Sequence, residues 1–197
     1  AGYNPVVIVR GKSVDERKKS VREFTKSGAL DPESNVQFGE GGAGTFSDGK
    51  LNTGVSGTLI KTVLREFVKH GAPPEIVYSS RPHIGSDKLP ETVKNIRLEI
   101  ERLGGKVLFG KKLEKFVING GKIAAAIING EEIRVDDVVL AVGHSARDTF
   151  YELARENVAM ERKQFAMGFR IEHKREFIDE AQYGKKFADI LPAADYR

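Results

Sequence analysis

A glycine-rich stretch in the first half of this sequence limits what the chain can fold into more than any other feature. Five glycines fall within the eleven residues 39–49. Glycine adopts positive φ without strain and lacks the Cβ that keeps a ligand away from the backbone. Successive backbone N–H groups in such a loop can also bind an anion. A flexible linker is glycine-rich too, but Phe38, Phe46 and Leu51 flank or interrupt this stretch. We therefore predict an ordered loop that lies against a ligand.

Gly39, Gly41 and Gly44 have the spacing G-x-G-x-x-G. A dinucleotide-binding turn of this kind ends a strand and opens a helix, whose N-terminus receives the pyrophosphate. The ten residues that follow Gly44 have no helical apolar period and contain two further glycines. The spacing by itself therefore predicts a loop and not a Rossmann turn.

Composition narrows the class of protein. The 197 residues include no cysteine, which excludes disulfides, thiolate metal sites and thiol redox chemistry. No apolar run approaches the ~20 residues that span a bilayer, and no secretory signal opens the chain, so we expect a cytoplasmic protein that does not contact a membrane. Basic and acidic residues are interspersed and the net charge is only +4, which argues against a nucleic-acid surface. The four histidines lack ligand spacing and predict no metal site.

Apolar patterning predicts an α/β chain. Val6–Val9 and Asp137–Gly143 have the composition of buried strands in a parallel sheet. A capping box at Ser13 and Glu16 opens a helix that ends near Ser27. Helical spacing also predicts helices around Leu59–Val68, from Pro90 to Leu103, and around Phe150–Ala154, with a short helical turn after Pro73-Pro74.

The other elements are predicted strands and one solvated face. Lys106–Phe109 is a short strand, and the residues after Leu113 form an antiparallel meander with an Asn129-Gly130 hairpin turn. Phe165–Ile171 alternates like a strand, and the remaining tail is weakly patterned. The basic run Arg17–Lys19 is interpreted as the solvated face of the first helix.

This order of elements resembles that of flavoproteins with two dinucleotide-binding domains, and in particular the bacterial family of FAD-dependent or NAD(FAD)-utilising dehydrogenases. Four segments carry the resemblance: Val36–Thr53 (VQFGEGGAGTFSDGKLNT), Arg81–Lys88 (RPHIGSDK), Val138–Phe150 (VVLAVGHSARDTF) and Phe165–His173 (FAMGFRIEH). The resemblance implies a partial Rossmann-like FAD-binding domain in residues 1–53 and 106–162, a helical insert in 54–105, and the start of a substrate domain in 163–197.

The resemblance also implies that the chain is the central fragment of a longer oxidoreductase. The family's pyrophosphate turn would lie before Ala1, and its C-terminal return segment after the substrate region. The family's ribose-binding glutamate corresponds to Val9, which cannot accept a hydrogen bond. Ala1–Pro5 is typical of a helix end, in agreement with a fragment. We expect such a fragment to bind FAD poorly and to self-associate through the exposed edge of its first strand.

By this resemblance the intact protein transfers hydride between FAD and a small organic substrate or nicotinamide, with NAD(P)H as a candidate second substrate. The candidate cofactor-binding residues are Arg10, Gly39, Gly41, Gly42, Gly44, Thr45, Ser47, Asp48, Gly49, Leu113, Ala141, Gly143, Ser145 and Arg147. The candidate catalytic residues are His144 and Lys50, and the candidate substrate-binding residues are Arg81 and His83.

Each candidate has a structural alternative. The glycine loop can be a tight connection between domains, Lys50 an ordinary surface lysine, and the segment around His83 a solvated loop. Ser145 can act as a helix N-cap, with Asp148 in the position of a capping-box partner. A rival function is a non-catalytic module that binds RNA or a protein, supported by the sequence pI of about 9.2.

Overall fold

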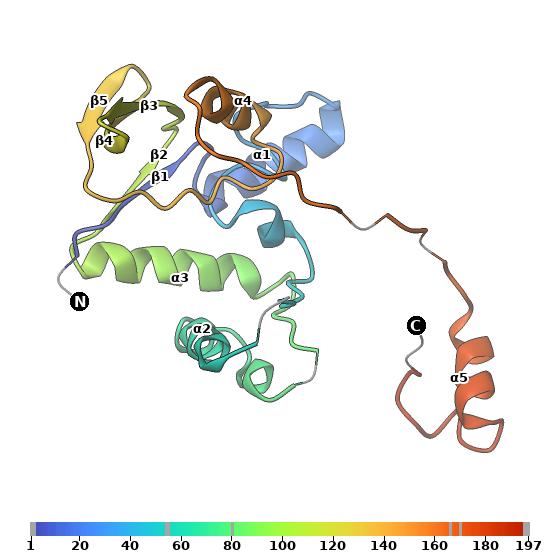
Figure 1. Ribbon diagram of the computed structural model, residues 1–197. Helices are drawn as coiled ribbons and strands as arrows, with labels where there is room; N and C mark the ends of the chain where they lie inside the picture. The colour runs from blue at the N-terminus through green and yellow to red at the C-terminus, as the bar shows by residue number, and fades with distance from the viewer. Residues whose placement is uncertain (1–2, 54–55, 80, 166, 170, 195–197) are drawn as a thin grey trace. The chain divides into compact units, whose positions relative to one another are not determined.

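The fold is that of a computed structural model (Figure 1), which describes residues 3–53, 56–79, 81–165, 167–169 and 171–194. The chain divides into two compact units, Ala1–Ala159 and Met160–Arg197. Each unit is described by itself.

The first unit alternates helices and short strands. Its strands are β1 (Val6–Val9), β2 (Lys106–Phe109), β3 (Leu113–Asn119), β4 (Lys122–Ile128) and β5 (Glu131–Arg134). Its α-helices are α1 (Val14–Ser27), α2 (Thr58–Lys69), α3 (Leu89–Arg102) and α4 (Arg147–Arg155), and its 3₁₀ helices are η1 (Gly42–Phe46) and η2 (Pro74–Val77). The second unit contains the helix α5 (Arg175–Tyr183).

The strands form two sheets of different kinds. β1 pairs with β2 in parallel, with Val6 opposite Lys106 and Val9 opposite Phe109. β3, β4 and β5 form an antiparallel meander, whose second turn places Asn129 and Gly130 at φ 49° and 78°. Positive φ at both turn residues matches the twist of the flanking strands. The meander and the predicted helices are confirmed, and the described fold is mixed α/β.

Helix α1 has a clear beginning and end. The Glu16 carboxylate accepts hydrogen bonds from the backbone N–H and the hydroxyl of Ser13, at 3.3 and 2.8 Å. At the other end Gly28 adopts the left-handed conformation and donates its N–H to the carbonyl of Phe24. Both ends therefore satisfy backbone groups that an uncapped helix would leave to solvent.

Two hydrophobic clusters fill the first unit. One joins α2, η2 and α3 through the buried residues Ala72, Ile76, Ile84 and Leu89. The other packs α4 against the meander through Phe116, Ala126, Ile128 and Leu153. The first cluster lies beneath the C-terminal arm of the glycine-rich loop, because Leu51 packs against it.

The predicted strand Asp137–Gly143 is wrong, since these residues form no strand in this structure. Val139 is 92% exposed, and β1, predicted to be buried, exposes Val6 and Val7. The physical reason is the same in both places. Among the described residues β1 pairs only with β2. The sheet therefore offers no further strand to pair with the Asp137–Gly143 segment, and no neighbouring strand extends the sheet beside β1.

The second unit also differs from expectation. Phe165, Met167, Phe169 and Ile171 alternate as predicted, but they are exposed and no strand includes them. Positions 166 and 170 of this predicted strand lie outside the described residues, as do Ala1 and Gly2 of the predicted helix end. Helix α5 was not predicted, although the (i, i+4) pair Arg175–Asp179 and the following Gly184 are signals of a helix and its end.

Candidate functional site

The glycine-rich loop is a tight, ordered turn, as predicted. Gly41 and Gly42 have φ of 79° and 61°; Gly41 is the N-cap of the short 3₁₀ helix η1, and Gly42 is its first residue. Consecutive positive φ values are strained for residues that carry a Cβ, which accounts for two adjacent glycines. The loop therefore has a defined backbone path and is not a spacer.

The guanidinium of Arg17, on helix α1, fixes this path from inside. Arg17 is 0% exposed. Its guanidinium donates hydrogen bonds to the backbone carbonyls of Asn35, Val36, Glu40 and Gly42 and to the hydroxyl of Thr45. It also lies 4.9 Å from the centre of the Phe46 ring. Burial lowers the pKa of Arg17 to about 10, so the side chain is charged at neutral pH and its donors remain in place.

Arg17 was expected on the solvated face of α1, and that expectation is wrong. Residues three and four apart lie on one face of a helix, so Arg17 follows Val14 and precedes Val21 on the face that packs inward. Val14 is fully buried. The helical spacing was thus the signal that identifies Arg17, whereas its charge and its basic neighbours pointed to solvent.

Glu40 supplies a second anchor, which the sequence did not single out. Its carboxylate accepts the backbone N–H of Val14 at 2.7 Å and the Nε of Arg97 at 2.7 Å. The Glu40 side chain is 6% exposed and that of Arg97 16%. Arg97 belongs to α3, so Glu40 ties the loop to α1 and α3 together.

The inner and outer sides of the loop differ in how much space they leave. A Cβ added at Gly39 or Gly41 would collide with the side chain of Arg17 or Thr45, at 2.2 and 2.1 Å. A Cβ added at Gly42 or Gly44 would meet no atom within 4 Å. The inner glycines are therefore needed for packing, and the outer glycines leave the backbone open to a large ligand.

Two of the candidate cofactor-binding hydroxyls are used within the loop. The Thr45 hydroxyl is buried and donates to the Glu40 carbonyl at 2.9 Å. The Ser47 hydroxyl donates to the Gly44 carbonyl at 2.8 Å and accepts the N–H of Gly49 at 3.0 Å. Both hydroxyls stabilise the turn itself.

The C-terminal arm of the loop brings together candidates that are far apart in sequence. Lys50 and His83 face each other in an isolated antiparallel bridge. The Lys50 Nζ lies 3.0 Å from an oxygen of Asp48, and the hydrogen bond from Lys50 lowers the pKa of Asp48. Arg81 is exposed two residues before His83. The candidate catalytic lysine and the candidate substrate-binding histidine therefore belong to one surface.

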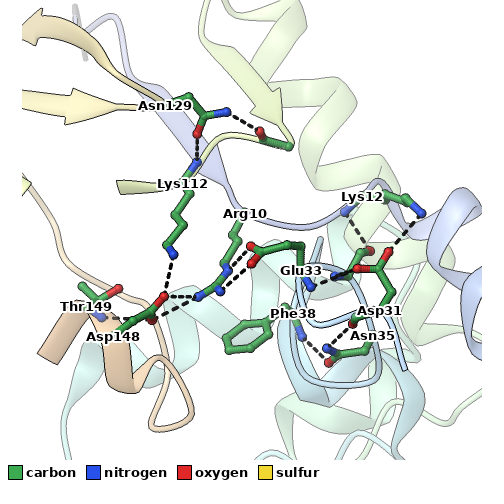
Figure 2. A network of polar contacts seen from close by, with 12 residues as sticks. Arg10, Lys12, Asp31, Glu33, Asn35, Phe38, Lys112, Asn129, Asp148 and Thr149 are labelled. Carbon is green, nitrogen blue, oxygen red and sulfur yellow. Dashed lines mark hydrogen bonds and ion pairs between the residues drawn. The ribbon is translucent and has the colours of Figure 1, made fainter. Parts of the chain in front are cut away.

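Arg10, at the end of β1, lies at the centre of a separate polar network (Figure 2). Its guanidinium contacts Glu33 at 2.5 and 2.9 Å and Asp148 at 3.0 and 3.1 Å, and lies 4.8 Å from the centre of the Phe38 ring. Lys112 also contacts Asp148, at 2.7 Å. The hydrogen bond to Glu33 raises the pKa of Arg10. The guanidinium is thus shared between two carboxylates, and a phosphate at this position would have to compete with both.

The other candidates lie at or near helix α4. Leu113 lines a hollow of about 310 Å³ together with Lys112, Asp148 and Arg155. Ala141 and Gly143 lie in the irregular segment that precedes α4. Arg147 is the exposed first residue of that helix.

The N-cap of α4 is Ala146, so the alternative of Ser145 as an N-cap is wrong. The Ser145 hydroxyl instead lies 3.4 Å from Nε2 of His144. Asp148 accepts the backbone N–H of Thr149 and contacts Arg10 and Lys112, so it does not act as a capping-box partner of Ser145.

Comparison with known proteins bears on the class of the chain. Residues 164–197 match the family described as "FAD-dependent protein, C-terminal domain-like". The whole chain is 53% identical to an uncharacterized protein of Clostridium beijerinckii (strain ATCC 51743 / NCIMB 8052). The chain spans 37% of the length of that relative. These matches support an FAD-dependent protein family.

Within the ranges that the structure describes, no helix is long and apolar enough to span a membrane.

Proposed function

We propose that this chain is part of an FAD-dependent oxidoreductase in which the outer side of the glycine-rich loop contacts the cofactor. The observation that carries this proposal is the contrast between the two sides of the loop. Arg17 and Glu40 fix the loop from inside, while the positions of Gly42 and Gly44 stay open on the outside. The family match of residues 164–197 supports the same class of protein.

The open surroundings of Gly42 and Gly44 leave room for a planar cofactor, and a side chain at either position would occupy that space. Arg10 does not offer an unengaged cation to the pyrophosphate, since Glu33 and Asp148 already bind it. When bound, FAD supplies the redox chemistry, and the protein supplies orientation and electrostatics. The contribution of this chain is a loop whose shape is set before the cofactor binds.

His144 remains the residue proposed to hold or accept a proton. It is exposed in the segment before α4, and its Nε2 lies 3.4 Å from the Ser145 hydroxyl. Gly143 and Ser145 are proposed to approach the cofactor from the same segment. These assignments are supported by the sequence resemblance, as is hydride transfer to a small organic substrate.

Substitutions at the outer glycines test the proposal. Gly42→Ala and Gly44→Ala add a methyl group to the open side of the loop, and we expect each to weaken FAD binding at least tenfold. Gly120→Ala is the matched control for Gly42→Ala, because Gly120 has φ 58° and equally open surroundings in a hairpin turn. Flavin fluorescence during titration measures the affinity in the full-length Clostridium beijerinckii relative with the equivalent substitutions, because residues 1–197 alone are expected to bind FAD poorly.

The experiment also separates a binding role from a structural one. We expect Gly42→Ala and Gly120→Ala to cost similar stability, about 1 kcal/mol, because both place a Cβ at positive φ. If the full-length relative binds no flavin, or if the loop variants bind it as well as the Gly120→Ala control does, the proposal is wrong.

A further inference from the structure

The bridge between Lys50 and His83 has a defined geometry. The Leu51 N–H donates to the Pro82 carbonyl at 2.8 Å, and the Ile84 N–H donates to the Gly49 carbonyl at 3.1 Å. These two bonds flank the Lys50–His83 pair, which makes it a non-hydrogen-bonded antiparallel pair. The Cα atoms of such a pair are only about 4.5 Å apart and the two side chains leave the same face. Lys50 and His83 therefore project side by side.

The opposite face of this bridge is buried. Gly49 is buried, and a Cβ there would lie 3.1 Å from Leu89 and 3.4 Å from Ile84. Ile84 and Leu89 belong to the hydrophobic cluster of α2, η2 and α3, and Leu51 packs against it. Because neighbouring residues of a strand point to opposite faces, this burial directs Asp48, Lys50 and His83 outward and fixes the backbone beneath them.

The charges on the outer face are unusual for an antiparallel pair. Two basic side chains directly opposite each other repel when both are charged. Asp48 offsets this repulsion, since its carboxylate lies 3.0 Å from the Lys50 Nζ. The Gly85 N–H donates a hydrogen bond to the Asp48 backbone carbonyl, which fixes the position of Asp48 next to the bridge. The Lys50 and Asp48 side chains are 70% and 60% exposed, so a ligand can reach both.

We propose that Lys50 and His83 form a binding site for an oxyanion, the carboxylate or phosphate group of a small molecule, and that Asp48 occupies the ammonium until the ligand replaces it. The ammonium of Lys50 and a ring N–H of His83, on one rigid face, can both donate hydrogen bonds to the ionised acceptor that an oxyanion offers. Asp48 acts as an internal competitor. Anion binding at this site does not require flavin, so it can be tested independently of the proposed cofactor role of the glycine-rich loop.

Nuclear magnetic resonance of the histidine rings tests this site in the 197-residue chain without FAD. Sodium malonate and inorganic phosphate are titrated separately at constant ionic strength, with chloride as the baseline. We expect the His83 ring signals to shift and saturate at about 1–10 mM, a range typical of weak ligands. The rings of His70, His144 and His173 serve as internal references. The anion that saturates at the lower concentration identifies the carboxylate or the phosphate source.

Substitutions at Lys50 and Asp48 are predicted to change the anion affinity in opposite directions. We expect Lys50→Gln to weaken binding at least fivefold, and Asp48→Asn to tighten it at least twofold because the competitor is removed. Lys61→Gln, which removes an exposed lysine of α2, is the matched control and is expected to leave the affinity unchanged. The proposal is overturned if all four histidines shift in parallel, if Lys50→Gln and Lys61→Gln behave alike, or if Asp48→Asn weakens binding.

Discussion

The guanidinium of Arg10 and the carboxylate of Asp148 lie 3.0 Å apart, although 138 positions separate them in the sequence. Arg10 directly follows the first strand, β1, and Asp148 lies in the first turn of α4. Lys112, just before β3, reaches the same carboxylate (Figure 2). The Asp148 carboxylate thereby joins the end of β1, the start of β3 and the start of α4.

Asp148→Asn tests how much this junction stabilises the unit. We expect the free energy of unfolding to fall by about 1–2 kcal/mol, because Arg10 and Lys112 lose the negative charge that they contact while the site stays partly exposed. Urea unfolding followed by circular dichroism measures it. Asp136→Asn, at an exposed position between β5 and α4, is the control and is expected to change stability by less than about 0.5 kcal/mol. Equal losses in the two variants would show that the junction contributes nothing specific.

The same junction predicts a loss of stability in acid. The hydrogen bond from Arg10 lowers the pKa of Glu33. Burial alone would raise the pKa of Asp148, but hydrogen bonds from Lys112 and the Thr149 backbone, with the charge of Arg10, outweigh it and lower the pKa. A carboxylate with a lowered folded pKa stabilises the protein above its ordinary pKa, 4.5 for Glu and 3.8 for Asp, and this stabilisation is lost as the pH falls through the folded pKa.

We therefore expect the contribution of Glu33 and Asp148 to the free energy of unfolding to stay constant from pH 7 to about 5 and to decline below about pH 4.5. Thermal unfolding at several pH values measures the decline. The Asp148→Asn variant should decline less steeply than the original chain, because one of the titrating groups is gone. A variant that declines just as steeply would place the acid sensitivity elsewhere.

Two serines near helix starts are predicted to differ in their effect on stability. Ser13→Ala should cost about 1 kcal/mol, because it removes the capping-box interaction with Glu16 at the start of α1. Ser145→Ala should cost less than about 0.5 kcal/mol, since α4 has Ala146 as its N-cap and no side-chain cap. Chemical unfolding of both variants under one set of conditions checks the order. A reversed order would mean that the Ser145 hydroxyl caps α4 after all.

The outer edge of β1 is predicted to drive self-association. Within the part of the chain that the structure describes, β1 pairs only with β2, and its Val6 and Val7 are exposed. An unpaired, apolar strand edge is a template for pairing with a second copy. Val7→Lys should therefore lower the apparent mass in sedimentation equilibrium at high concentration, whereas Val36→Lys, at an equally exposed position outside the strands, should not. A chain that is monomeric at every concentration would contradict this prediction.

Local signals predicted much of the fold. Ser13, Glu16 and Gly28 mark the start and end of α1, and Asn129-Gly130 sets the hairpin of the meander, because these residues act through bonds to near neighbours in the chain. The predicted strand Asp137–Gly143 failed because a strand also depends on a partner, which its own composition does not supply.

The conformation of the glycine-rich loop was predictable to a similar degree. The glycines identified the loop, since positive φ at Gly41 and Gly42 is a property of those residues themselves. What holds the loop was missed, because Arg17 and Glu40 act through contacts with residues 18 to 57 positions away. The pairing of Lys50 with His83 also depends on tertiary folding, which brings two loops into register.

The contacts of Arg17 make the shape of the glycine-rich loop a property of helix α1. Arg17 lies in the first turns of that helix, and the backbone carbonyls that it holds belong to residues 35–42. Whatever frays the start of α1 also releases the loop, so the two should open as one cooperative unit and exchange their amide hydrogens with similar protection. A change at the helix cap, far along the chain from the glycines, would then alter the surface that a ligand meets.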